Sequence, residues 1–137
     1  MNEITFTGNV SKIYEPRQTR SGETIFAFDL AVDNGYFDKT RNRWMSRTRF
    51  QPVVTYRDLA NNVRATLAKG MAVTVTGKLL DDSYTPAGSD YSVRRDKLEA
   101  SDVAVSLRFA TAVVAKTGKS PREEGMEHNR EQLAATA

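Results

Sequence analysis

The sequence predicts an all-β domain with one helix, folded as a five-stranded barrel in the order β-β-β-α-β-β. Three observations lead to this fold class. Apolar and β-branched residues recur in five stretches that are bounded by turn residues, which indicates five strands. Residues 58–69, between the third and fourth stretches, instead repeat their apolar residues every four positions, as an amphipathic helix does. The chain of 137 residues is long enough for one domain with a hydrophobic core.

The first two strands are expected within the first 33 residues. The first strand carries Ile4, Phe6 and Val10 on one face, with Gly8 on the same side, where a bend or a close backbone approach is expected. Turn residues follow at 20–22. The second strand has apolar side chains at every second position: Phe26, Phe28, Leu30 and Val32. We expect these four residues to lie in the core.

The third strand and the helix follow a basic loop. Residues 50–56 are rich in β-formers, and Pro52 places this strand at a sheet edge or a bulge because proline has no N–H to donate. The helix is expected to begin with Asp58 as its cap and to end at Lys69 and Gly70. A cation suits the C-terminal dipole, and glycine adopts the left-handed conformation that closes a helix. The apolar face of the helix consists of Leu59, Val63 and Leu67.

Two further strands are expected after the helix. Residues 73–79 alternate between two faces, and residues 98–105 form the last strand, with an irregularity at Ser101-Asp102. The polar segment between them is expected to be a hairpin that turns near residues 86–88. A closed five-stranded barrel with a helix between its third and fourth strands is the oligonucleotide/oligosaccharide-binding (OB) fold.

Aromatic and cationic residues concentrate between Tyr36 and Arg57. These positions hold five of the twelve aromatic residues and six cations, with Asp38 as the one acid. Flat rings stack on unpaired bases, and cations attract the phosphates between them, so the segment is typical of proteins that bind single-stranded nucleic acid. A solvated basic hairpin whose aromatic residues belong to the core would have the same composition, and both interpretations stay open at this point.

The distribution of charge favours a polyanionic partner. The net charge is +3, and residues 109–137 carry four cations and four anions, so the positive excess lies in residues 1–108. The absence of cysteine excludes disulfides and thiolate metal sites, and the one histidine, His128, has no catalytic partner pattern. Asp81 and Asp82 are neighbours on a strand and point to opposite faces, so they make a poor metal site. We therefore expect neither enzyme activity nor a cofactor.

The sequence shows no signal for a membrane. No apolar run approaches the roughly 20 residues that span a bilayer, and the first residues lack the basic-then-apolar order of a signal peptide. A cytoplasmic protein is the expectation.

Five pieces of the chain, in order, resemble the bacterial single-stranded DNA-binding protein family, and the resemblance covers residues 3–108. The last of these pieces resembles the fourth strand of the family, which leads to an aromatic residue, here Tyr84. The pieces are ITFTGNV (4–10), FDLAV (28–32), YRDLANNV (56–63), LAKG (67–70) and VTVTGKL (73–79).

The resemblance implies which side chains bind DNA. Family members stack bases on a few aromatic side chains, which by local spacing fall here on Tyr36, Phe50, Tyr56 and Tyr84. The family often has tryptophan at several of these positions, whereas the smaller rings of this chain offer less stacking area. The one tryptophan, Trp44, lies in the adjacent loop, where it stacks on a base, covers a subunit interface or lies on its own barrel.

Five arginines are the candidates for phosphate contacts: Arg41, Arg43, Arg47, Arg49 and Arg57. Arg47 and Arg49 alternate with Thr48 and therefore point to the same side of the incoming strand. The pair Arg94-Arg95 counts for less, because Asp90 and Asp96 lie nearby in the sequence and are able to neutralise it.

Residues 106–112 resemble more specifically the actinobacterial members, in which an extra strand after the barrel helps to clasp subunits together. Leu107, Phe109 and Val113 are separated by even numbers of positions, so they would share one face of such a C-terminal strand. The resemblance also implies a homotetramer around which the DNA wraps. The expected interface residues lie in the first strand and in the clasp: Ile4, Phe6, Leu107, Phe109 and Val113.

The composition changes near the end of the chain. Residues 1–114 are expected to form the DNA-binding domain, and the polar residues 115–137 a disordered tail. Replicative family members end in an acidic, phenylalanine-terminated tip that docks repair and replication enzymes, and residues 132–137 do not resemble it. Recruitment through such a tip is not expected, and the resemblance favours an auxiliary or mobile-element paralogue.

Two functions from different classes follow from these observations. The first is a protein of the nucleoid that coats single-stranded DNA with little sequence preference in replication, recombination or repair. The second is an OB-fold protein-interaction module of the primosome type that binds nucleic acid weakly. RNA in place of DNA also stays open, because contacts to the 2′-OH are not legible in a sequence.

Overall fold

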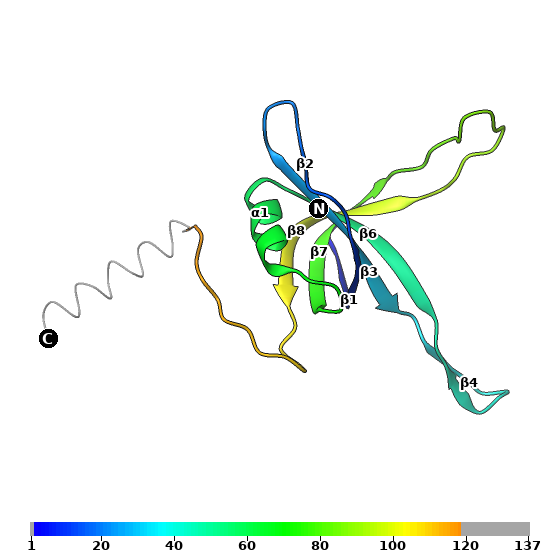
Figure 1. Cartoon of the computed structure of the whole chain (residues 1–137). Helices are drawn as coiled ribbons and strands as arrows, with labels where there is room; N and C mark the ends of the chain where they lie inside the picture. The colour runs from blue at the N-terminus through cyan, green and yellow to red at the C-terminus, as the bar shows by residue number, and fades with distance from the viewer. Residues whose placement is uncertain (1, 119–137) are drawn as a thin grey trace, which may run out of the picture.

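Five long strands close into a barrel in the computed structural model, which describes residues 2–118 (Figure 1). The barrel strands are β1 (Ile4–Ile13), β3 (Thr24–Asp33), β6 (Thr48–Tyr56), β7 (Ala72–Asp81) and β8 (Asp96–Val105). The short strand β2 (Arg17–Gln18) lies beside β3, and β4 (Tyr36–Asp38) pairs with β5 (Arg43–Met45) in a separate hairpin. The helix α1 (Arg57–Thr66) lies between the third and fourth barrel strands, as the sequence predicts for an OB fold.

The barrel closes where β1 changes partners. Residues Ile4–Asn9 of β1 pair with β7, and residues Asn9–Ile13 pair with β3. Gly8 lies at this change, and a Cβ on it would collide with the carbonyl oxygen of Ala31, so the close approach that the glycine indicated is confirmed. Only glycine fits there because the neighbouring backbone occupies the space that a side chain needs.

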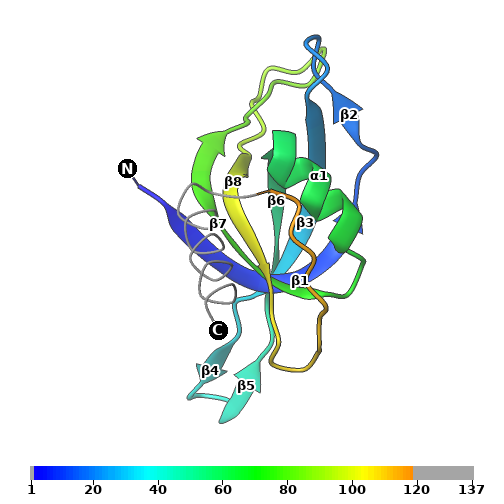
Figure 2. The ribbon, with the colours of Figure 1, turned by 90° about the vertical axis from the view of Figure 1, so that its left-hand side faces the viewer.

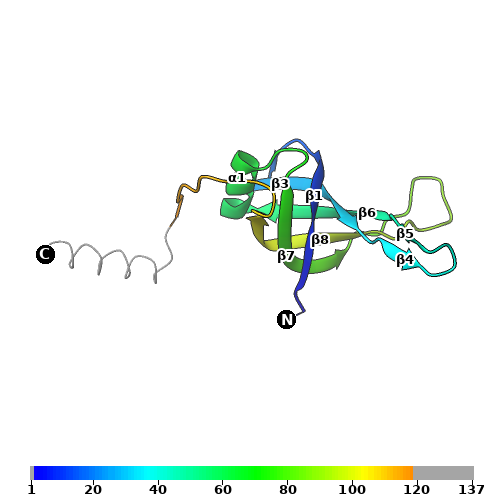
Figure 3. The same ribbon diagram turned by 90° about the horizontal axis from the view of Figure 1, so that it is seen from below.

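The core fills the barrel as the alternating pattern predicts. Phe26, Phe28, Leu30 and Val32 of β3 are buried, and β7 contributes Val73 and Val75. The helix α1 packs across β3, β6 and β8 and buries Ala60 and Val63 against the core (Figure 2). Two hairpins, β4–β5 and residues 82–95, project from the side of the barrel that lies away from α1 (Figures 1 and 3).

The ends of α1 differ from the prediction. Tyr56 is the N-cap and no side chain caps the helix, so Asp58 lies in the first turn instead of at the cap. The reason is that β6 runs directly into the helix through Arg57, whose φ is +59°. The helix ends at Thr66, and Gly70, with φ +91°, belongs to the following loop, where its N–H donates to the carbonyl of Val10 at 2.7 Å.

Three other local predictions are confirmed. Thr76 and Gly77 of β7 pair with Asp102 and Ala100, which leaves Ser101 as an extra residue in β8. The segment after β7 turns at residues 86–88, with Gly88 at φ +79°. Pro52 lies on a stretch of β6 that pairs with β3 alone, because β6 pairs with β8 only at residues 53–54.

The chain after β8 forms no strand within the described residues. Residues 106–118 turn back beside α1 (Figure 2), where Thr117 and Asn62 share a hydrogen bond of 2.9 Å between Oγ1 and Oδ1. The C-terminal strand expected over residues 107–113 is therefore absent from the single chain, because after β8 the chain turns toward α1 instead of running beside another strand. Most of the predicted tail, residues 119–137, lies outside the described residues. Among residues 2–118, no helix is long and apolar enough to cross a membrane.

Candidate nucleic-acid interface

The strand β6 turns two aromatic rings away from the core. Phe50, Pro52, Val54 and Tyr56 occupy its outer face, while Gln51, Val53 and Thr55 point into the barrel and are buried. Phe50 is 61% exposed, and Tyr56 is half-buried. The sequence left open whether the aromatic residues belong to the core. The structure exposes the ring of Phe50 and part of Tyr56, while Val54 between them is buried.

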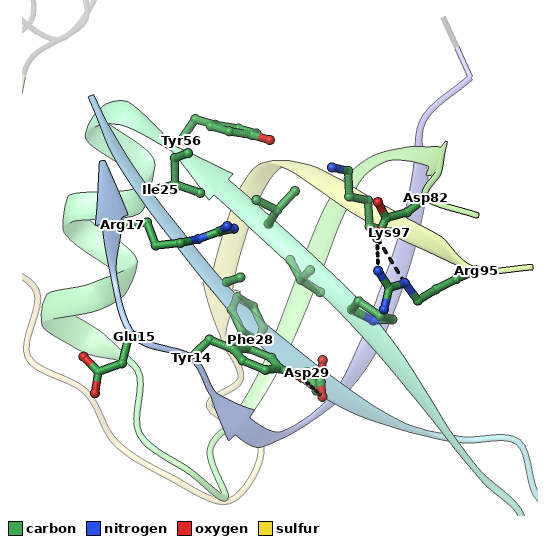
Figure 4. Close-up of a pocket in the computed structure, with 14 residues that line it drawn as sticks. Tyr14, Glu15, Arg17, Ile25, Phe28, Asp29, Tyr56, Asp82, Arg95 and Lys97 are labelled. Atoms are coloured by element: carbon green, nitrogen blue, oxygen red, sulfur yellow. Dashed lines mark hydrogen bonds and ion pairs between the residues drawn. The ribbon is translucent and has the colours of Figure 1, made fainter. Parts of the chain in front are cut away.

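A groove runs along this face. Its floor is made by the outer residues of β6 and of β3, which pair directly: Ile25 with Tyr56, Ala27 with Val54, and Asp29 with Pro52. Tyr14 and Arg17 form one wall, and Asp82, Arg95 and Lys97 form the other (Figure 4). The volume of this groove is about 760 Å³.

A second groove continues the first. It has a volume of about 940 Å³ and includes Phe50 and Arg94. Pro52 and Arg95 line both grooves, so the two form one open track that leads from Tyr56 to Phe50. We call this surface the β6 groove, and a track of this length suits an extended chain better than a small molecule.

Arg95 joins the β6 groove to the predicted stacking residue Tyr84. Its guanidinium lies 5.0 Å from the centre of the Tyr84 ring, and its Nη2 lies 2.8 Å from Oδ2 of Asp82. Tyr84 is 47% exposed at the base of the projecting hairpin, where it pairs with Val93. The sequence discounted Arg95 because of Asp90 and Asp96, whereas its partner is Asp82.

The β4–β5 hairpin carries aromatic rings on both of its faces. Tyr36 lies opposite Met45, and Phe37 lies opposite Trp44, so Tyr36 and Trp44 point to opposite sides. A Cβ on Gly35 would lie 2.6 Å from Nε1 of Trp44, which shows that the indole lies across that glycine. Trp44 thus packs on its own hairpin, is 60% exposed, and does not cover the barrel.

The five predicted phosphate-binding arginines do not form one cluster. Arg41 and Arg43 lie at the tip of the β4–β5 hairpin, where Nε of Arg41 is 3.8 Å from Asp38. Arg47 is exposed at the start of β6, and its carbonyl accepts the N–H of Asn34.

The other two arginines lie on or near the barrel and have acidic partners. Nη2 of Arg49 lies 3.4 Å from Asp96, at the edge of the second groove. Arg57, at the junction of β6 and α1, lies 3.2 Å from Glu23.

Several groove residues were not among the binding residues that the sequence predicted, among them Tyr14, Arg17, Asp29 and Lys97. They belong to separate strands and loops, and only closure of the barrel brings them together. Tyr14 donates its hydroxyl to Oδ2 of Asp29 at 2.8 Å, and this hydrogen bond raises the pKa of the Tyr14 phenol. A tyrosine directly after the first strand, with a cation two positions before it, was the available signal.

The residues expected at an oligomer interface differ in their exposure. Ile4 is exposed on β1, while Phe6 is half-buried against the core with Arg49 over its ring. Leu107, Phe109 and Val113 are all exposed after β8. No group of three potential metal ligands gathers in the described part of the chain.

Comparison with known proteins adds a family to this geometry. The model of the single-strand binding protein family matches residues 1–105. The chain belongs to the single-strand binding protein family. The resemblance that the sequence motifs indicated is therefore confirmed.

Several relatives of this family member are actinobacterial. It is 35% identical over 119 residues to the single-stranded DNA-binding protein of Paenarthrobacter aurescens, a match that covers 85% of this chain and 68% of the relative. It is 39% identical over 116 residues to the protein of that name from Corynebacterium glutamicum, with 83% and 51% covered.

Solved structures agree with the fold of this family member. A small single-stranded DNA-binding protein from Streptomyces coelicolor has a TM-score of 0.64 and 29% identity, with 77% of this chain and 94% of that chain covered. A Plasmodium falciparum single-stranded DNA-binding protein in complex with single-stranded DNA has a TM-score of 0.69, with 77% and 95% covered. At 22% identity, the second supports the fold alone.

Proposed function

We propose that this chain is a non-catalytic protein that binds and coats single-stranded DNA in replication, recombination or repair. The observation that carries the proposal is the pair Phe50 and Tyr56, whose rings lie on one outer face of β6 along a groove bordered by cations. The names of the relatives and the family description support DNA as the partner. We infer from such a partner that the protein works in the cytoplasm, in association with the nucleoid.

The arrangement favours single strands because a duplex hides the faces of its bases. Stacking on an aromatic ring contributes about 1–3 kcal/mol per base, and every base has a face to stack. Arg17, Arg95 and Lys97 along the groove attract the phosphates between stacked bases. Binding of this kind depends little on sequence.

A titration at two salt concentrations tests the proposal. A labelled homopyrimidine oligonucleotide should bind tightly at low salt, and its affinity should fall as salt rises, because bound cations release counterions from the strand. No binding at low salt would end the proposal. Competition with RNA of the same sequence decides between the two nucleic acids.

We also propose that the chain assembles as a homotetramer. Residues Ile4–Gly8 of β1 pair with β7 on one side only, which leaves their second edge open in the described chain. An open edge pairs readily with another chain, and the exposed apolar residues Leu107, Phe109 and Val113 offer a further contact. Light scattering should give four times the chain mass at micromolar concentration, and a monomer would contradict the assembly.

A further inference from the structure

An acidic side chain lies in the middle of the β6 groove. Asp29 is on the outer face of β3, directly opposite Pro52, while Tyr56 and Phe50 pair with Ile25 and Ala31 on either side of it. A strand that stacks on both rings therefore passes over Asp29. Its carboxylate repels the phosphates of that strand, so charge alone would not favour an acid at this position.

The carboxylate of Asp29 is held in place with one oxygen free. Its Oδ2 accepts the hydroxyl of Tyr14 at 2.8 Å, and within the described part of the chain no other donor reaches it (Figure 4). The backbone is fixed as well, because the carbonyl of Asp29 accepts Oγ of Ser11 and the residue pairs with both β1 and β6. Oδ1 is thus a positioned hydrogen-bond acceptor on the groove floor.

Asp82, on the wall of the groove, has a different environment. Its Oδ2 accepts Nε and Nη2 of Arg95 at 3.1 Å and 2.8 Å, so its charge is paired with a cation. Asp29 has no cationic partner among the described residues. The carboxylate of Asp29 is therefore an unpaired charge that a hydrogen bond from Tyr14 holds on the groove floor.

We propose that Asp29 accepts a hydrogen bond from the exocyclic amino group of a base, and that this contact favours cytosine over thymine at one position of the track. The inference rests on the proposed function and adds a base preference to it. A carboxylate accepts the N4 amino group of cytosine, whereas thymine presents the O4 carbonyl there, which repels the anion. The N3–H of thymine lies between two carbonyl oxygens, so it is a poor substitute donor.

The test compares oligo-dC with oligo-dT of equal length on the full chain and on Asp29→Asn and Asp29→Ala. The two strands also differ in their own stacking, so the informative quantity is how the dC-to-dT affinity ratio changes between proteins. Both variants should bind oligo-dT more tightly because a negative charge is lost, whereas oligo-dC also loses a hydrogen bond. The ratio should fall by about tenfold or more, the size expected from one hydrogen bond to a charged group.

A matched control separates hydrogen bonding from charge. Asp82→Asn removes a negative charge from the wall of the same groove, away from the floor between Phe50 and Tyr56, so it should leave the dC-to-dT ratio unchanged. If Asp29→Asn and Asp29→Ala change the two affinities by the same factor, Asp29 acts through charge alone and the inference is wrong.

A change in the ligand tests the same contact without relying on the folding of a variant. Oligomers of N4,N4-dimethylcytosine lack both amino hydrogens, and the wild-type chain should lose about tenfold more affinity for them, relative to oligo-dC, than Asp29→Ala does. An equal loss in the two proteins would overturn the inference. Failure of the wild type to bind any strand at low salt would instead overturn the proposed function.

Discussion

Phe50 is exposed and Tyr56 is half-exposed because the alternation of β6 turns Gln51, Val53 and Thr55 inward. Gln51 is fully buried at the barrel end, where its amide donates to Asp96 and accepts Arg49. Leaving a large ring in water forgoes roughly 1.5–3 kcal/mol of burial. Stacked bases recover that free energy, so the exposed rings favour binding over stability.

Removal of both rings should therefore weaken DNA binding far more than it weakens the fold. We expect the double substitution Phe50→Ala and Tyr56→Ala to lower affinity by about 100-fold or more, at roughly 1–3 kcal/mol per ring. Fluorescence anisotropy with a labelled oligonucleotide measures the loss, and Thr76→Ala on the opposite barrel surface is the control. A loss below about threefold would favour the protein-interaction module over DNA coating.

The hydrogen bond between Tyr14 and Asp29 should appear in a pH titration. It raises the pKa of Tyr14, which means that the folded state favours the neutral phenol. Its contribution to stability is present below the ordinary tyrosine pKa of about 10 and is lost as pH rises through the raised value. Phenolate absorbance should show that Tyr14→Phe lacks the phenol that titrates late, and an unchanged late phase would contradict this assignment.

For single residues, the sequence showed which side chains share a strand face better than it showed which face is exposed. The even spacing of Phe50 and Tyr56 puts both on one face of their strand. Val53 and Val54 give each face an apolar residue, so the pattern did not say which face lies outside. It also chose arginines by their density along the chain. The groove instead takes Arg17 and Lys97 from elements far apart in the sequence.

Barrel strands approach each other closely at glycines, where a side chain would not fit. Gly77 lies beside the bulge at Ser101, where a Cβ would collide with the carbonyl of Glu99 and lie 2.8 Å from Cα of Ala100. Both obstacles are backbone atoms, so neither gives way easily. The sequence predicted the bulge, because a break in alternation is a local signal, but it misplaced the helix ends, which depend on how β6 enters α1.

We expect Gly77→Ala to lower the free energy of unfolding by about 1–3 kcal/mol, as overpacking of a tight site does. Gly118→Ala is the matched control, because nothing lies within 4 Å of a Cβ there. Chemical denaturation followed by circular dichroism measures both. Equal stability of the two variants would show that β7 and β8 have room to separate at this point.

In the whole molecule, the two hairpins project from the side of the barrel that lies away from α1, and they diverge from each other (Figures 1 and 3). Residues 106–118 lie beside α1 (Figure 2). The order of strands and the single helix were predictable from periodicity. The C-terminal strand was not, because the path of residues 106–118 depends on their contact with α1 and not on their own alternation.

Two truncations should separate the barrel from the rest of the chain. Residues 116–137 carry four cations and four anions and no aromatic residue, so their removal should leave DNA affinity and assembly nearly unchanged. Removal from Arg108 onward should weaken the oligomer, because Phe109 and Val113 go with it. Sedimentation and anisotropy measure the two effects. A tenfold change in affinity from the shorter truncation, about 1.4 kcal/mol, would assign the tail a role in binding.

Photo-crosslinking reveals the path of the strand over the barrel. Ultraviolet irradiation of the full chain with oligothymidine, followed by mass spectrometry of the linked peptides, identifies the residues that touch bases. We expect crosslinks at Phe50 and Tyr56, with Tyr14 or Tyr84 beside them. Crosslinks confined to the β1–β7 surface around Thr5 and Thr76, with none in the β6 groove, would contradict this path.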